Sequence, residues 1–418
     1  MTFNNLNLHP QIIKALIDAG YEIPTPIQSK AIPEILKRSD IKASAQTGTG
    51  KTAAFLLPAL HHLTTSNPTA GKGPRILILV PTRELALQVE EQAKKYSKYL
   101  KRIKTVCVIG GVPYHKQISQ LSRPYDILIA TPGRLIDLMD RRKISFSRLD
   151  TFILDEADRM LDMGFLEPVE QIADKIPAKK QTLFFSATLQ GNVAALAEKL
   201  LNNPIEIAVN AQQEKHEYIE QQLFYTDNLN HKNRLLDHLL QKSHQNHTII
   251  FTATKKHADH LVRELKEKGH DAGALHGDMH QRKRTRVLAS LKATKIRILV
   301  ATDVAARGID VRTITHIINF DLPNSAEDYV HRIGRTGRAG AKGIAISFAS
   351  RKDRELVKKI EKFTGNAINI VKIPGLEPQS KEKASLTKQD FRKQRFNPKR
   401  AKNKQRFHHK RKKSTRHH

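Results

Sequence analysis

A glycine-rich loop near the start of the chain has the residue types and spacing that bind phosphate groups. Residues 45–52 read AQTGTGKT and lead into a helical pattern rich in Ala and Leu. Gly48 and Gly50 allow a tight turn whose backbone N–H groups can point at phosphate oxygens. Lys51, at the start of the helix, can reach the β- and γ-phosphates, and Thr52 can be a ligand of Mg²⁺. The pattern predicts a nucleotide-binding loop.

The first position of this loop departs from the general phosphate-binding pattern. The general pattern begins with glycine, whereas this loop begins with Ala45, at the end of the apolar run Ile41–Ala45. A chance Gly-Lys-Thr turn is therefore an alternative. We nevertheless expect the whole loop to bind a nucleotide, through Ala45, Gln46, Thr47, Gly48, Thr49, Gly50, Lys51 and Thr52, with Lys51 also acting in catalysis.

An acidic segment follows another apolar run. Phe152–Leu154 leads directly into Asp155 and Glu156. Asp155 is suited to hold Mg²⁺ through a water molecule, and Glu156 is suited to orient and deprotonate an attacking water. Alone, such a segment is more often a solvated helix start, because acidic residues favour that end of a helix. After a buried strand, and in a chain with a phosphate loop, it indicates a catalytic site.

Strands and helices alternate in two series up to about residue 375. Apolar strands separated by helices indicate parallel sheets covered on both faces, so we expect an α/β protein with two such sheets in tandem. The polar stretch 210–218 (NAQQEKHEY) has neither period and is interpreted as a linker between residues 1–209 and 219–375. The expected strands are Ile41–Ala45, Arg75–Val80, Ile103–Ile109, Asp126–Ala130, Thr151–Leu154, Thr182–Phe185, Gln222–Tyr225, Thr248–Phe251, Arg297–Ala301, His316–Asn319 and Ile344–Phe348.

The charge of the chain indicates a polyanionic partner, most often nucleic acid. The 418 residues carry a formal net charge of +31, and residues 381–418 account for +14 of it. This tail, which we take to begin at residue 376, is too poor in aliphatic side chains to offset its ordering entropy. We expect a disordered arm that binds RNA or ribonucleoprotein; a solubilising tail is the alternative. Its terminal histidines raise a metal hypothesis that no folded spacing supports: His408, His409, His417 and His418.

Composition excludes several classes of protein. The single cysteine, Cys107, rules out a disulfide framework and a cysteine-cluster zinc site and fits a reducing compartment. No apolar run approaches the ~20 residues of a membrane span. The first ten residues lack the basic and apolar regions of a secretory signal. We therefore expect a cytoplasmic protein.

Asp155-Glu156-Ala157-Asp158 is the signature of the DEAD-box RNA helicases, and the chain resembles this family over about residues 1 to 375. The family's own phosphate loop begins with Ala, which accounts for Ala45. Its other motifs are matched in order by Gly20-Tyr21 with Pro24–Gln28, by Pro81–Leu85, by Gly110-Gly111, by Thr131–Arg134, by Ser186–Thr188, by Ala301–Asp310 and by His331–Arg338. The short core and basic tail are most like those of the bacterial RhlE-type branch.

The resemblance implies two RecA-like domains, with ATP and Mg²⁺ in the cleft between them and RNA across both. Gln28 would read the adenine edge, which suits an amide that both donates and accepts; a solvated glutamine is the alternative. Tyr21 or Phe3 would pack on adenine, although either could belong to the core. Asp310 would accept from the ribose hydroxyls, or else cap a turn.

Two arginines in the last motif would act in catalysis. Arg335 and Arg338 are three residues apart, so we expect them to share a helix face. They would neutralise charge developing on the γ-phosphate; a surface basic patch is the alternative. Residues that would relay the state of one site to the other are Asp158, Ser186, Thr188 and His331.

The expected RNA contacts consist of small hydroxyls, arginines and glycines that hold phosphates and 2′-hydroxyls without reading bases. Binding should therefore be largely independent of sequence. Ala253 stands where the family commonly has a basic or polar residue, so Gln281 and Arg284 would supply contacts nearby. The full set is Thr82, Arg83, Gly110, Gly111, Thr131, Arg134, Gln281, Arg284 and Thr302.

The expected function is that of an ATP-dependent RNA helicase that separates short duplexes locally and hydrolyses ATP when RNA is bound. Two alternatives remain open: a DNA helicase of the same superfamily, and an RNA annealer or ribosome-assembly scaffold in which the tail dominates. Ribosome assembly and mRNA turnover are both reasonable settings. The sequence leaves the oligomeric state and the physiological RNA undetermined.

Overall fold

The structure, a computed structural model, describes residues 2–45, 48–65, 71–209, 219–242, 247–306, 311, 313–337 and 341–379. The chain divides into Met1–Glu377 and Pro378–His418, and almost all described residues belong to the first unit. The expected linker 210–218 and the tail from residue 380 lie outside the described residues. So do four of the expected site residues, Gln46, Thr47, Asp310 and Arg338.

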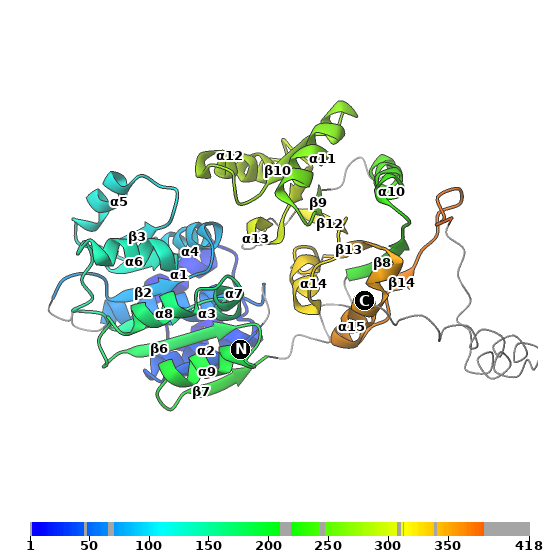
Figure 1. Cartoon of the computed structure of the whole chain (residues 1–418). Coiled ribbons are helices and arrows are strands. Elements are labelled where there is room, and N and C mark those ends of the chain that lie inside the picture. Colours follow the sequence, from blue (N-terminus) through cyan, green and yellow to red (C-terminus); the bar gives the residue numbers. More distant parts are fainter. Residues whose placement is uncertain are drawn as a thin grey trace, which may run out of the picture. The chain divides into compact units, whose positions relative to one another are not determined.

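Seven parallel strands form the first sheet, in the order β3-β4-β2-β5-β6-β1-β7 (Figure 1). Successive side chains of a strand face opposite sides of the sheet. Ile76 and Ile78 therefore enter one core while Leu77 and Leu79 enter the other. The strands are β1 (Ile41–Ser44), β2 (Ile76–Leu79), β3 (Thr105–Val108), β4 (Ile127–Ala130), β5 (Thr151–Leu154), β6 (Gln181–Ser186) and β7 (Ile205–Ala208).

The second sheet repeats this order position for position, as β10-β11-β9-β12-β13-β8-β14. Its strands also pair in parallel, for example Ile250 with Val300 and with Ile318. They are β8 (Ile219–Tyr225), β9 (His247–Phe251), β10 (Ala272–Leu275), β11 (Ile298–Ala301), β12 (Ile314–Asn319), β13 (Gly343–Ala349) and β14 (Asn369–Ile370).

Helices cover both faces of each sheet, as parallel sheets require. In the first half, α1–α4 pack on one face and α5–α9 on the other. These are α1 (Pro10–Asp18), α2 (Pro26–Leu36), α3 (Lys51–Thr65), α4 (Arg83–Tyr96), α5 (Tyr114–Leu121), α6 (Pro132–Asp140), α7 (Ala157–Asp162), α8 (Leu166–Ala173) and α9 (Asn192–Leu200), after the 3₁₀ turn η1 (Phe3–Leu6).

In the second half, α10 and α11 pack on one face and α12–α15 on the other. The helices are α10 (Leu229–Lys242), α11 (Lys255–Glu267), α12 (Gln281–Lys292), α13 (Asp303–Ala306), α14 (Ala326–Ile333) and α15 (Arg354–Thr364), with the 3₁₀ turn η2 (Arg351–Asp353). Two parallel seven-stranded sheets of the same order, each between two helical layers, confirm the expected tandem RecA-like architecture.

The expected motifs gather because of this topology. Carboxyl ends of parallel strands share one edge of a sheet, where ligands of open α/β sheets bind. Ala45 follows β1, Thr82 follows β2, Gly110 follows β3, Thr131 follows β4 and Asp155 follows β5. Residues that are far apart in sequence are therefore placed along one edge of the first sheet.

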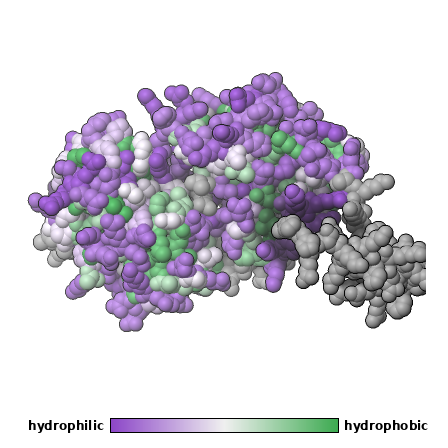
Figure 2. Space-filling view, in the orientation of Figure 1, coloured by the Kyte–Doolittle hydropathy of each residue, from purple (hydrophilic) through white to green (hydrophobic). Residues whose placement is uncertain are grey.

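The described surface is mostly polar. Hydrophilic residues cover most of the face drawn in Figure 2, with smaller hydrophobic areas between them. Within the described residues, no helix is long and apolar enough to cross a membrane.

Candidate functional site

The loop after β1 has the backbone that its glycines predict. Gly48 has φ 81° and Gly50 has φ 93°, in the left-handed region that favours glycine. Lys51 is the first residue of α3 and is 6% exposed. Its ammonium is close enough to Asp155 to lower the pKa of that carboxyl. A cation at a helix N-terminus, beside a buried acid, is the arrangement that the phosphate-loop prediction requires.

Gln28, on α2, is tied to the phosphate loop. Its side-chain Nε2 donates to the carbonyl of Gly50 at 3.1 Å, and its Oε1 accepts from the backbone N–H of Thr25 at 3.0 Å. The side chain is 6% exposed, so the alternative of a solvated glutamine is wrong. Because Gln28 contacts the loop directly, it can link the occupancy of the loop to the position of α2.

The two aromatic candidates for adenine packing differ in their surroundings. Phe3 is 4% exposed within the first-sheet core, which supports its core alternative. Tyr21 is half-buried, with its ring 6.1 Å from that of Tyr96 and the ammonium of Lys95 5.0 Å from its centre. Tyr21 is therefore partly exposed, whereas Phe3 is not.

The acidic residues after β5 are buried. Asp155 is 2% exposed and Glu156 is 6% exposed. Burial raises the pKa of Asp155 to about 7, although Lys51 acts in the opposite direction. Glu156 has φ 54° and ψ 50°, a left-handed backbone that is strained for a residue other than glycine and recurs at active sites.

Ser186 joins the acidic segment to the strand ends. Its Oγ accepts from the backbone N–H groups of Asp158 and Thr188, each at 3.3 Å, and its carbonyl accepts from the N–H of Ala45 at 3.0 Å. Asp158 Oδ1 is buried and has no hydrogen-bond partner among the described residues. The hydroxyl therefore holds two motifs together.

A groove of about 300 Å³ brings together most of the expected RNA-binding residues of the first half. The Thr82 hydroxyl accepts from the N–H of Leu85 and caps α4. A side chain at Gly110 or Gly111 would press on the guanidinium of Arg83, and Gly111 also has φ 78°, which favours glycine at that position. The groove is lined by Pro81, Thr82, Arg83, Glu84, Gly110, Thr131, Gly133, Arg134, Met163, Phe165, Gly277 and Arg284.

Gln281 and Arg284 have neighbours that the sequence did not predict. Arg284 is buried, and its Nε donates to Glu84 at 2.8 Å. Gln281 accepts from Arg83 at 3.3 Å. These side chains contact the motif after β2 directly, so their polar groups are engaged with protein. Thr302, half-buried after β11, lies outside the lining of this groove.

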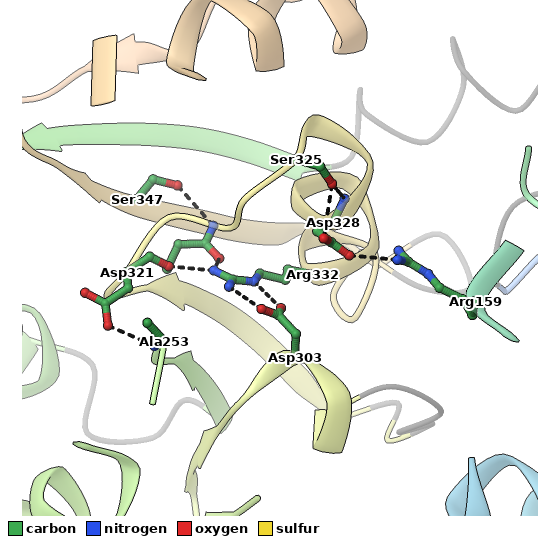
Figure 3. A network of polar contacts seen from close by, with 9 residues as sticks. Arg159, Ala253, Asp303, Asp321, Ser325, Asp328, Arg332 and Ser347 are labelled. Atoms are coloured by element: carbon green, nitrogen blue, oxygen red, sulfur yellow. Dashed lines mark hydrogen bonds and ion pairs between the residues drawn. The ribbon is translucent and has the colours of Figure 1, made fainter. Parts of the chain in front are cut away.

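A polar network centred on Arg332 organises the strand ends of the second sheet (Figure 3). Its guanidinium donates to both carboxylate oxygens of Asp303, at 2.6 and 2.7 Å, to Asn319 at 3.1 Å and to the carbonyl of Asp321 at 2.6 Å. Asp321 in turn accepts from the N–H of Ala253 at 2.9 Å. One buried side chain of α14 therefore fixes the segments after β9, β11 and β12.

Sequence reasoning missed this network, although Arg332 lies inside the matched segment His331–Arg338. It also missed Arg159 on α7, which donates to Asp328 on α14 at 2.7 Å (Figure 3). A buried arginine is rare unless it is paired, but a sequence does not show which arginine will be buried.

One expectation about the last motif is wrong. Helix α14 ends at Ile333, with Gly334 as its C-cap and Gly337 at φ 65°. Arg335 therefore lies in the turn after the helix, 6% exposed, and not on a face of α14. Gly337 lies in the left-handed region that favours glycine and that a continuing helix does not adopt. His331, on α14, has a buried Nδ1 with no partner among the described residues.

The donor set after β1 and β5 fits magnesium. Mg²⁺ prefers oxygen ligands from one or two carboxylates and from hydroxyls, with waters and phosphates completing its coordination. Asp155 supplies a buried carboxylate, and Thr52, on the first turn of α3, supplies a hydroxyl. Within the described residues, no cluster of three His, Cys, Asp or Glu residues could hold a metal by itself. A magnesium site here would therefore depend on the phosphates of the nucleotide.

A phosphate loop, a buried acid pair after β5 and a second sheet of the same order define a tandem RecA-like nucleotide hydrolase. The family model described as DEAD/DEAH box helicase matches residues 25–196, and the one described as Helicase conserved C-terminal domain matches residues 231–340. The RNA helicase SrmB of Escherichia coli is 42% identical over 381 residues, which cover 91% of this chain and 86% of SrmB. RhpA of Helicobacter pylori is 41% identical, over 89% of this chain and 74% of RhpA.

Solved structures agree with this assignment. Dbp5 of S. cerevisiae bound to RNA and ADP BeF3 aligns with a TM-score of 0.80 and 33% identity, over 89% of this chain and 95% of Dbp5. Mss116p bound to ssRNA and AMP-PNP aligns with a TM-score of 0.81 and 31% identity, over 90% and 81% of the two chains. The chain belongs to the DEAD-box family and is an ATP-dependent RNA helicase.

Proposed function

We propose that the residues after β1 and β5 carry out ATP hydrolysis, as follows. The Gly48 and Gly50 turn and Lys51 hold the phosphates, and Glu156 orients the attacking water and accepts its proton as ADP and phosphate form. Mg²⁺, held by Thr52 and through water by Asp155, would supply charge neutralisation at the phosphates. The observation that carries this proposal is the burial of Asp155 and Glu156 beside a lysine at a helix N-terminus.

The remaining ATP contacts complete this proposal. Gln28 and Tyr21 bind adenine, and Asp310 binds the ribose. Arg335 and Arg338 neutralise charge on the γ-phosphate. Of these, Gln28 donates to the carbonyl of Gly50 and accepts from the N–H of Thr25, so we propose that ATP binding exchanges these contacts for the adenine edge.

RNA binding and ATP binding are proposed to be coupled through the segments that touch both. Asp158, Ser186 and Thr188 form one hydrogen-bonded group, and His331 and Asp158 each have a buried atom free to gain a partner among ligands or neighbouring segments. If both ligands favour the same arrangement of the two halves, each raises the affinity for the other. Unwinding is then local: a strand bound in a bent path loses a few base pairs, and hydrolysis releases it.

The strand path is proposed to follow the groove of Thr82, Arg83, Gly110, Gly111, Thr131 and Arg134, and to reach Thr302 in the second half. Gln281 and Arg284 also belong to the proposed set. Their contacts with Arg83 and Glu84 support a second role for them, which is to position Arg83 in the groove.

The substitution Glu156→Gln tests the hydrolysis proposal. It keeps the size and polarity of the side chain and removes the base, so turnover should fall by about 100-fold or more while ATP affinity stays within about twofold. Glu167→Gln, an exposed position on α8, is the matched control. Near-normal RNA-stimulated ATP hydrolysis by Glu156→Gln would contradict the proposed role.

RNA and DNA should be compared as stimulators of the same preparation. We expect RNA to stimulate hydrolysis and DNA of the same sequence to stimulate much less, because the proposed contacts include 2′-hydroxyls. Equal stimulation would favour a DNA helicase. Full cellular function of the Glu156→Gln protein would favour the annealer or scaffold alternative.

The domain division, tail and setting are also proposals. We propose domains at 1–209 and 219–375 joined by residues 210–218, and an RNA-binding tail at 376–418. We place the chain in the RhlE-type branch, supported by its short core and basic tail. We also place it in cytoplasmic ribosome biogenesis, which crosslinking and sequencing of bound RNA would test.

Deleting residues 381–418 should weaken RNA affinity and flatten its salt dependence, since each neutralised phosphate contributes about 0.7–0.9 to the log–log slope.

A further inference from the structure

An exposed tyrosine in the first half stands between two arginines. Tyr114, the first residue of α5 (cyan in Figure 1), is 37% exposed. The guanidinium carbon of Arg134 lies 4.3 Å from the centre of its ring, and that of Arg141 lies 4.5 Å from it. These arginines are seven residues apart on α6 and its C-cap, about two helical turns. Both guanidinium groups therefore lie against the Tyr114 ring.

Asp137 fixes this group from within. It accepts from the Tyr114 hydroxyl and, at 3.0 Å, from Arg141 Nε, and it lies 3.8 Å from Arg134 Nε. Asp137 is one turn from each arginine, so all three α6 side chains share one face. Each of the four side chains is held by at least one other. The result is a stack of planar groups whose orientation is set before any ligand arrives.

The stack adjoins the proposed RNA groove. Arg134 lines that groove together with Thr131 and Gly110. Its Nη1 also donates to the carbonyl of Val112 at 2.8 Å, directly after the two glycines. Arg134 is the inner end of the stack, with an 11% exposed side chain, and Arg141 is the outer end, with a 55% exposed side chain.

The chemistry of this surface suits an unpaired nucleotide base. Bases of single-stranded RNA stack on aromatic rings and on guanidinium planes. The exposed neighbours Lys116 on α5, and Arg142 and Lys143 after α6, are positively charged, which favours an adjoining phosphate backbone. A purely structural ring would gain more from burial in the core than from exposure between two charges.

We infer that Tyr114 and Arg141 form a stacking platform for one unpaired base of the RNA strand as it leaves the groove at Arg134. This inference rests on the proposed function, because it requires RNA in that groove. It adds a base contact, indifferent to base identity, to a path otherwise built from backbone contacts. The platform would hold a nucleotide in an unpaired conformation and so disfavour re-pairing of the displaced strand.

The test compares the affinity of full-length variants for a fluorescent single-stranded oligouridylate in the presence of AMP-PNP. Tyr114→Ala and Arg141→Ala should each weaken binding by about tenfold, within the range of one lost base stack. Tyr114→Phe keeps the ring and should stay within about twofold of the unsubstituted protein. Arg123→Ala, an exposed charge after α5, is the matched control for Arg141→Ala and should also stay within about twofold.

Two further readouts separate stacking from charge and from misfolding. Tyr114→Ala removes no charge, so the slope of log affinity against log salt should be unchanged. In a series of oligonucleotides, each with one abasic position, one member should bind the unsubstituted protein about tenfold more weakly than the intact oligonucleotide does. The same abasic position should not weaken RNA binding by Tyr114→Ala any further. Melting temperatures of all variants identify any that are misfolded, and Tyr114→Phe then carries the comparison.

Wild-type affinity in Tyr114→Ala and Arg141→Ala, or a defect that is the same at every abasic position, would overturn the platform. Either result leaves the proposed function intact, since the unsubstituted protein still binds RNA and is stimulated by it. Failure of the unsubstituted protein to bind any RNA would instead overturn the proposed function and the platform with it.

Discussion

Two carboxylates at matching positions in the two sheets differ in what surrounds them. Asp155 follows β5, and Asp321 follows β12; each strand is fourth in its sheet. Burial raises the pKa of Asp155 to about 7. Burial acts on Asp321 in the same direction, but His257, Lys232 and the N–H of Ala253 together hold its pKa well below the ordinary value.

The difference reflects how each charge is compensated. Asp321 accepts from Lys232 Nζ at 2.8 Å and from a backbone N–H, so its charge is satisfied by the protein. Asp155 is more deeply buried, and among the described residues its carboxylate accepts from the backbone N–H of Glu156. A buried acid left under-compensated is expensive, and such groups concentrate at functional sites because a ligand completes them.

The loops that follow the matching strands β1 and β8 differ in whether their residues suit a backbone cradle for phosphate. After β1 the chain has two glycines with positive φ before Lys51. After β8 it has Thr226-Asp227-Asn228, with no glycine, before α10 begins at Leu229. A backbone cradle for phosphate needs those glycines. The same topology therefore carries a glycine loop in one half, and in the other an ion pair beside a cavity of about 880 Å³ whose lining includes Lys232 and Asp321.

The largest expected effect contrasts the two lysines that adjoin these carboxylates. Lys51→Ala should reduce ATP turnover by about 100-fold or more, the scale of losing one charge clamp on a transferring phosphoryl group. Lys232→Ala should leave turnover per folded molecule unchanged and lower the melting temperature. ATPase assays and thermal melts of both variants measure this. Comparable ATPase losses in the two variants would show that the second sheet also has a catalytic role.

A second pair of variants should change stability in opposite directions. Asp321→Asn removes a charge that Lys232 and a backbone N–H compensate, so it should lower the free energy of unfolding by about 1–3 kcal/mol. Asp155→Asn removes a buried charge with little compensation, so it should raise the free energy of unfolding by about 1 kcal/mol. The same substitution should abolish ATP turnover, because residues that serve function are often unfavourable for stability. Urea melts without nucleotide provide the measurement. Destabilisation by both would mean that Asp155 is structurally satisfied.

A smaller effect concerns acid sensitivity of the first half. His62, on α3, is 8% exposed and contacts the carbonyl of Ile35 at 3.2 Å. Burial, aided by the positive charge of Arg38, lowers its pKa to about 4. The unfolded chain, with a histidine pKa near ~6.5, binds more protons than the folded chain between about pH 6.5 and 4. Stability should therefore fall as the pH falls through that window and be insensitive to His62 above it.

His62→Gln removes the titration and keeps a donor for the Ile35 carbonyl. Its melting temperature should fall less steeply between pH 6.5 and 4 than that of the unsubstituted protein. His115→Gln, an exposed position on α5, is the control and should follow the unsubstituted protein. Parallel curves for the His62 variant would show that this histidine does not contribute to acid sensitivity.

The strands that the sequence predicted best are those with continuous apolar runs. Ile76–Leu79 and Thr151–Leu154 were expected within one residue of their observed bounds, because strands buried on both faces need apolar residues throughout. Three strands were not predicted. Ala272–Leu275 reads AGAL, whose small residues have weak strand preference; β7 alternates exposed and buried residues at an edge; and β14 is only two residues long.

The site residues also divide into those that the sequence predicted and those that it missed. The phosphate loop, the acid pair and the serine that joins them could be predicted because each chemistry fixes residue types at fixed spacing. The expected helix through Arg335 was wrong because α14 ends at Ile333, and Gly337 has a left-handed φ that a continuing helix would not allow. The pairing of Arg284 with Glu84, and of Arg332 with Asp303, joins residues far apart in the chain, and charge alone does not say which partners will meet.

By itself, the sequence determined the chemistry of this protein: which residues can hold phosphates, activate water and contact an RNA backbone, and in what order they occur. Only the tertiary structure decided which of them meet. The strand order of each sheet brings β1, β5 and β6 together, leaves Asp155 buried with little compensation and satisfies Asp321 with a lysine. The reason is that compensation of a buried charge depends on neighbours supplied by the whole fold, whereas the type of each residue is written locally.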